Sequence, residues 1–132
     1  MDDRLAIIDD LLARPIPEGS QGHVHVLHRT RDFWDERGPE VVEPAQAEID
    51  ALHDALAAAL SQRWGGPEPF DLSPYLFAED PAPEPIDELC QLTTTMLLWR
   101  PAPARWFGLA VGQADPEFPI ELLAAVGDTL PR

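Results

Sequence analysis

Apolar residues recur at helical spacing in two stretches of the chain. Between residues 3 and 14 the spacing predicts a short amphipathic helix, which follows two aspartates and ends before Pro15. A longer helix is predicted over 44–64, because Pro44 suits a first helical turn and seven alanines raise the helical propensity. Gly65 and Gly66 would end it. Its apolar stripe consists of Ile49, Leu52, Leu56, Leu60 and Trp64.

Alternation of polar and apolar residues predicts strands elsewhere. Histidines and aliphatic residues alternate over 23–28, the period-2 pattern of a strand. Thr30 follows and can cap a brief helical turn over 30–36. Residues 93–100 and 105–112 are rich in residues that favour strands, and the four-residue connection between them predicts a hairpin.

The register of this hairpin decides what each face presents. If Arg100 lies opposite Arg105, then Trp99 and Trp106 are cross-strand neighbours on one face. They would lie beside a strip almost without side chains, formed by Gly108, Ala110 and Gly112. The other face would be core and hold Thr94, Met96, Leu98, Phe107, Leu109 and Val111. The tryptophan face would either form a shelf for a ligand or partner or receive the long helix of the same chain.

Two segments have weaker patterns. Asp115 and Pro116 resemble a helix N-cap and first helical residue, which predicts a final helix ending near Val126; the alternative is an edge strand over 119–126. Six prolines in 65–88 exclude a long element there and predict an ordered connector with one short strand over 75–78. Its apolar residues remain to be buried: Phe70, Leu72, Tyr75, Leu76 and Phe77.

These elements together predict a single α+β domain over 1–132. A small antiparallel sheet would be built on the 93–112 hairpin and joined by the 23–28 strand. The 44–64 helix would cover one face of this sheet, and short helices would lie near both ends of the chain. The Pro-rich connector over 65–88 belongs to the same domain.

Charge narrows the classes of partner. The chain has 24 acidic residues and 9 basic residues, all arginine, and a formal net charge of −15. A field of this sign repels nucleic acids and anionic membranes and attracts a basic protein. Between Gly65 and Trp99 there are seven acids and no base. We therefore expect no nucleic-acid or membrane partner, and a basic protein partner through this acidic region.

The remaining sequence features indicate a cytoplasmic protein without a cofactor. Cys90 is the single cysteine, so an intrachain disulfide and a multi-cysteine zinc site are excluded, and its apolar neighbours suggest a buried, inert thiol. No apolar run approaches the roughly 20 residues that span a bilayer. The start of the chain is acidic where a secretory signal would be basic.

Candidate chemistry is sparse. His23 and His25 project to the same side of a strand, as two ligands of one metal must, but a third ligand is not apparent and solvent-facing histidines are the simpler interpretation. No nucleophile elbow, phosphate loop or dinucleotide fingerprint occurs. We therefore predict no catalytic residues.

A partner-binding set follows from the hairpin. Trp99 and Trp106 would offer the contact surface, and Arg100 and Arg105, crowded at the turn, would be neutralised by acids of the connector or by an external carboxylate. Those acids are Glu79, Asp80 and Glu84. The first hypothesis is accordingly a small acidic protein that binds a basic protein, as an inhibitor or immunity-type protein does. The alternative is a small metal-dependent or ligand-binding enzyme centred on His23, His25 and the tryptophan face.

Overall fold

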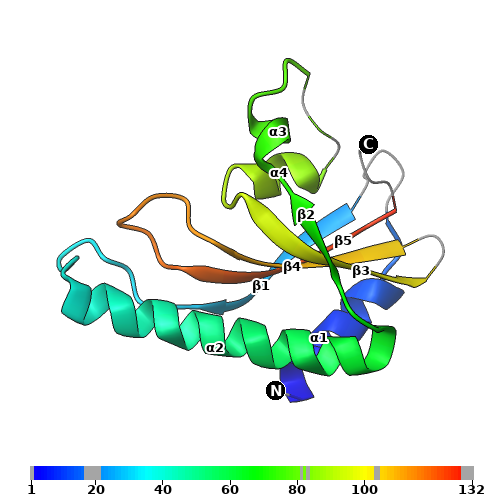
Figure 1. Cartoon of the computed structure of the whole chain (residues 1–132), viewed down its shortest axis with the longest axis horizontal. Coiled ribbons are helices and arrows are strands. Elements are labelled where there is room, and N and C mark those ends of the chain that lie inside the picture. Colours follow the sequence, from blue (N-terminus) through cyan, green and yellow to red (C-terminus); the bar gives the residue numbers. More distant parts are fainter. Residues whose placement is uncertain (1, 17–21, 81, 83, 103–104, 129–132) are drawn as a thin grey trace.

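The computed structural model describes residues 2–16, 22–80, 82, 84–102 and 105–128. It contains one five-stranded antiparallel sheet with the strand order β1-β5-β4-β3-β2 and helices on both faces (Figure 1). The predicted α+β class is confirmed. The elements are α1 (Asp2–Ala13), β1 (Gly22–Arg29), α2 (Pro39–Trp64), β2 (Glu68–Asp71), α3 (Ser73–Leu76), α4 (Ile86–Cys90), β3 (Thr95–Ala102), β4 (Arg105–Gly112) and β5 (Glu121–Gly127).

The sheet separates two hydrophobic cores. On one face α1 and α2 pack against the sheet, and their buried residues meet Trp99 and Phe107 (Figure 1). On the other face α3, α4 and Leu72 cover the sheet, and Leu72, Ile86 and Leu89 are fully buried there. The second covered face was not predicted, because the connector that forms it has no long periodic element. In the described residues no helix combines the length and apolar character needed to cross a bilayer.

Helix α2 begins five residues earlier than predicted. Gly38 is its N-cap, with an extended backbone, and Pro39 takes the first helical position. The amides of Val41 and Val42 both donate to the carbonyl of Gly38 at 3.0 Å. Pro44 therefore lies inside the helix, where its missing N–H leaves the carbonyl of Glu40 without the usual donor.

The last segment is a strand, and the predicted final helix is wrong. β5 pairs with both β1 and β4, so it is an interior strand rather than the edge strand of the alternative. Every residue from Leu122 to Gly127 is buried. A strand buried on both faces needs such a continuous apolar run, which a short sequence cannot distinguish from a buried helix. The 23–28 strand consequently joins β5 and not the hairpin.

The hairpin forms, but its predicted register is wrong by one residue. Trp99 lies opposite Phe107, and the register shifts between Trp99 and Ala102, which pairs with Arg105. Because side chains alternate along a strand, a slip of one residue moves them to the opposite face. The irregularity near the turn could not be read from the Pro-Ala connection.

Two short elements also differ from prediction. Residues 30–36 form no helix, because the hydroxyl of Thr30 accepts the amide of Ile120 at 2.9 Å instead of capping a helical turn. The connector strand is β2, at 68–71, while the predicted strand over 75–78 is replaced by α3 and the residues after it. Pro74 favours the first turn of α3, and the carboxylate of Asp71 accepts the amide of Ser73 at 2.9 Å.

Candidate functional site

The two hairpin tryptophans do not form a shelf. Trp99 faces α2, where its indole Nε1 donates to the carbonyl of Gly65 at 2.9 Å and its ring packs edge-on against Trp64. Trp106 lies on the opposite face of the sheet, over Gly127. Both side chains are only 2% exposed. Each indole therefore belongs to one of the two cores, and the predicted common face of Trp99 and Trp106 is absent.

The two hairpin arginines also have different partners from those predicted. Arg100 pairs with Glu68 on the neighbouring strand, with 3.1 Å between Nε and Oε1. Arg105 donates to the carbonyls of Leu12 and Arg14 at 3.3 and 2.8 Å, near the C-terminal end of α1. A cation at this end of a helix is favoured by the helix dipole. In the described residues neither arginine forms an ion pair with Glu79, Asp80 or Glu84.

The histidine pair lies on edge strand β1. His25 is exposed, and His23 is half-buried with its Nε2 atom shielded and without a hydrogen-bond partner. Among the residues that the structure describes, no three histidine, cysteine or acidic side chains converge as metal ligands. Cys90 is buried, and burial, followed by the charge of Asp87, raises the pKa of its thiol.

An acidic and apolar surface projects from the sheet on the side opposite α2. We call Leu76, Phe77, Glu79, Asp80 and Glu84 the α3–α4 surface; the chain that carries them extends outward between the two helices (Figure 1). The side chain of Phe77 is 83% exposed and that of Leu76 is 47% exposed. The prediction that both become buried is wrong; the buried apolar residues on either side of them are Leu72 and Ile86.

Buried anchors hold this surface in place. Before it, the side chain of Leu72 is fully buried and its amide donates to the carbonyl of Thr94 at 2.8 Å. Phe70 and Tyr75 stack with their ring centroids 6.0 Å apart. After it, Ile86 and Leu89 of α4 are fully buried. Leu76 and Phe77 are thus displayed from a segment that is packed at both ends.

The carboxylates of the α3–α4 surface, Glu79, Asp80 and Glu84, have no ion-pair partner among the described residues. Nearby, partial burial raises the pKa of Glu88, and the negative charges of Glu84 and Glu121 raise it further. Burial is thus the main cause of the Glu88 pKa shift, and the carboxylate of Glu84 adds to it.

The Glu88 shift predicts a pH-dependent gain in stability on replacing Glu88 with Gln. In an unfolded chain Glu88 loses its proton near its ordinary pKa of 4.5, whereas the folded protein retains it to higher pH. Native stability therefore falls as the pH rises through this window, and Glu88→Gln removes the loss. We expect a modest rise in Tm at pH 7, since solvent screens this exposed carboxylate, and almost none at pH 3.5. Thermal melts at both pH values measure this. The prediction would be contradicted if Glu88→Gln raised Tm equally at both pH values, or if Glu36→Gln raised Tm at pH 7 by the same amount.

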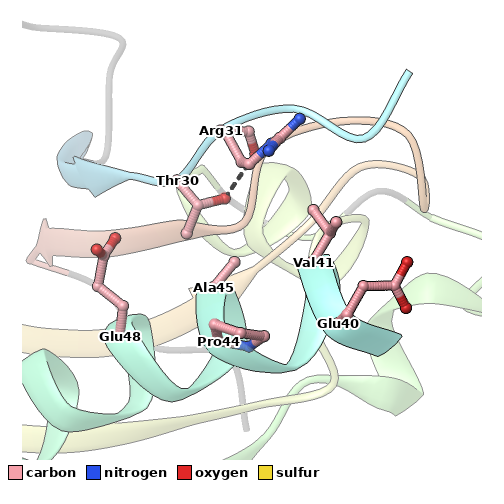
Figure 2. Close-up of a pocket in the computed structure, with 7 residues that line it drawn as sticks. All are labelled: Thr30, Arg31, Glu40, Val41, Pro44, Ala45 and Glu48. Atoms are coloured by element: carbon pink, nitrogen blue, oxygen red, sulfur yellow. Dashed lines mark hydrogen bonds between the residues drawn. The ribbon is translucent and has the colours of Figure 1, made fainter. Parts of the chain in front are cut away.

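A separate hollow of about 420 Å³ lies between the end of β1 and the first half of α2 (Figure 2). Sequence reasoning missed it, because it is formed by residues that are distant in the sequence and have no motif. Nothing in the sequence indicates that His28 and Glu48 would be in contact. The hollow is lined by Thr30, Arg31, Glu40, Val41, Pro44, Ala45 and Glu48.

Comparisons with protein-family models, curated proteins and solved structures find no match to this chain.

Proposed function

We propose that this protein acts by binding a basic protein through the α3–α4 surface, as an inhibitor or immunity-type protein does. One observation carries the proposal: Phe77 is 83% exposed and is followed by carboxylates that have no ion-pair partner in the described residues. We place the interaction in the cytoplasm, since a single cysteine suits a reducing compartment.

An exposed aromatic residue can anchor a protein interface. Burying a Phe side chain that water previously covered contributes about 1.5–3 kcal/mol. Interfaces concentrate their binding energy in a few such anchors near the centre, surrounded by polar residues at the rim. Phe77 and Leu76 fit the central role, and Glu79, Asp80 and Glu84 fit the rim.

The charges favour a basic partner over other classes. Rim carboxylates accelerate the encounter with a positively charged surface, and the net charge of −15 acts in the same direction. Because these carboxylates form no ion pair with any described residue, an arginine or lysine of the partner protein replaces water rather than an existing ion pair. Nucleic acids and anionic membranes would be repelled by the same field.

The proposal can be tested with the purified basic proteins encoded next to this gene as probes. We expect one of them to bind in a calorimetric titration, with affinity that falls as salt rises. Phe77→Ser should weaken this binding by about 2 kcal/mol or more, the effect typical of an interface anchor. A combined Glu79→Gln, Asp80→Asn and Glu84→Gln variant should slow association and reduce the salt dependence.

Matched variants distinguish a specific surface from general acidity. Glu36→Gln, Glu43→Gln and Asp54→Asn remove three exposed carboxylates elsewhere, so both triple variants carry the same net charge. The proposal is overturned if no basic neighbour binds with salt sensitivity, or if both triple variants weaken binding equally while Phe77→Ser has no effect.

A further inference from the structure

Three charged side chains line the hollow between β1 and α2, namely Arg31, Glu40 and Glu48, and the proposed function uses none of them. Arg31 approaches it from the chain after β1, and Glu48 approaches it from α2 (Figure 2). We call this site the β1–α2 hollow. It lies on the α2 side of the sheet, whereas the α3–α4 surface lies on the other side.

Glu48 is oriented by a chain of hydrogen bonds from α1. Nη2 of Arg4 is 3.1 Å from Nδ1 of His28, and Nε2 of His28 is 3.0 Å from Oε2 of Glu48. Arginine can only donate, so Nδ1 must accept and the ring proton must be on Nε2, which donates to Glu48. His28 is therefore the neutral tautomer in this arrangement. Oε1 of Glu48 has no hydrogen-bond partner among the residues that the structure describes.

Arg31 supplies the opposite charge. Its Nε donates to the carbonyl of Asp32 at 3.3 Å, and among the described residues it forms no ion pair with a carboxylate. Figure 2 shows Arg31 on the side of the hollow formed by the chain after β1, and Glu48 and Glu40 toward its two ends on α2. A guanidinium without a partner can bind a carboxylate with two parallel hydrogen bonds.

The wall of the hollow between Glu40 and Glu48 on α2 is apolar. Val41, Pro44 and Ala45 form it, and Pro44 has no backbone N–H to offer a ligand. Thr30 adds little hydrogen-bonding capacity, because its hydroxyl already donates to the carbonyl of Arg31 at 2.8 Å and accepts the amide of Ile120 at 2.9 Å. The hollow thus presents two carboxylates, an apolar wall and one guanidinium.

We propose that the β1–α2 hollow binds a small dipolar molecule with an ammonium group at one end and a carboxylate at the other. The ammonium binds Glu48, the carboxylate binds Arg31, and a hydrocarbon stem covers Val41, Pro44 and Ala45. The volume of about 420 Å³ lies in the range of small-molecule sites. This proposal does not depend on the proposed function, because the two sites lie on opposite faces of the sheet.

The test uses 6-aminohexanoate as the probe, with hexylamine and hexanoate as probes that each lack one charge. Calorimetric titration of the whole chain should show saturable 1:1 binding of 6-aminohexanoate and at least tenfold weaker binding of the other two. Glu48→Gln should lower the affinity for 6-aminohexanoate about tenfold or more, since it removes a charge-assisted hydrogen bond. Arg31→Gln should make the affinities for 6-aminohexanoate and hexylamine equal.

Two controls match these variants in charge. Glu43→Gln lies on the same helix and Arg37→Gln follows Arg31 in the same loop, and neither residue lines the hollow. Both should leave binding unchanged within about twofold, because exposed charges at a distance are screened. The proposal is overturned if 6-aminohexanoate shows no saturable binding, or if hexylamine binds as tightly as 6-aminohexanoate. It is also overturned if Glu43→Gln lowers the affinity for 6-aminohexanoate as much as Glu48→Gln does. Because Arg31 is exposed, its variant should fold even if Glu48→Gln disturbs the packing of His28.

Discussion

Replacing Phe107 by Ala is expected to lower the free energy of unfolding by about 3–5 kcal/mol. Phe107 is fully buried between α2 and the sheet, with its ring centroid 5.5 Å from that of Trp64 and 6.1 Å from that of Trp99. Removing the ring leaves a cavity and two indoles without their aromatic neighbour. Urea unfolding followed by tryptophan fluorescence measures the change.

Phe77→Ala is the matched control for this prediction. It deletes the same atoms from a side chain that is 83% exposed, so its effect on the free energy of unfolding should stay within about 0.5 kcal/mol. Similar losses for the two variants would contradict the assignment of Phe107 to the core and of Phe77 to the surface. A small effect of Phe77→Ala would also make the binding tests of Phe77 variants interpretable.

Replacing Gly127 by Ala is expected to destabilise the protein by about 1–3 kcal/mol through overpacking. Gly127 lies directly opposite Trp106 in the β4–β5 pair, and a Cβ atom there would approach the indole ring to 2.6 Å. A contact this short requires the ring or the strand to move. The measurement is the midpoint of urea unfolding compared with wild type.

A double-mutant cycle isolates the contact with Trp106. In a Trp106→Leu background the smaller side chain should tolerate the new methyl group. The double variant should therefore lose less free energy of unfolding than the two single variants lose in total. Gly66→Ala is the control, because no atom lies within 4 Å of a Cβ at that position. Strict additivity of the Gly127 and Trp106 changes would show that the indole does not lie over Gly127.

The local pattern of the sequence was enough to predict several elements. The helices α1 and α2, the strand β1 and the two arms of the hairpin all follow from spacing within a few turns or residues. The acidic character of the connector is likewise a property of composition, with seven acids and no base between Gly65 and Trp99. None of these features depends on which distant segment lies beside them.

The structure decided the features that depend on long-range pairing. Leu122–Val126 is apolar enough for a helix or a strand, and its place between β1 and β4 selects the strand. The irregularity between Trp99 and Ala102 places the two hairpin tryptophans on opposite faces. A one-residue slip moves every side chain of a strand to the opposite face of the sheet. The two tryptophans of the predicted binding face therefore lie in two different hydrophobic cores.

Both candidate sites also depend on tertiary structure. The sequence alone determined that this protein is acidic and that the segment between α2 and β3 has seven acids and no base. Only the fold decided that Phe77 remains exposed while Leu72 and Ile86 are buried, and that His28 lies between Arg4 and Glu48. Spacing along a chain specifies which side chains share a face of one element, whereas contact between elements is decided by how their surfaces pack together.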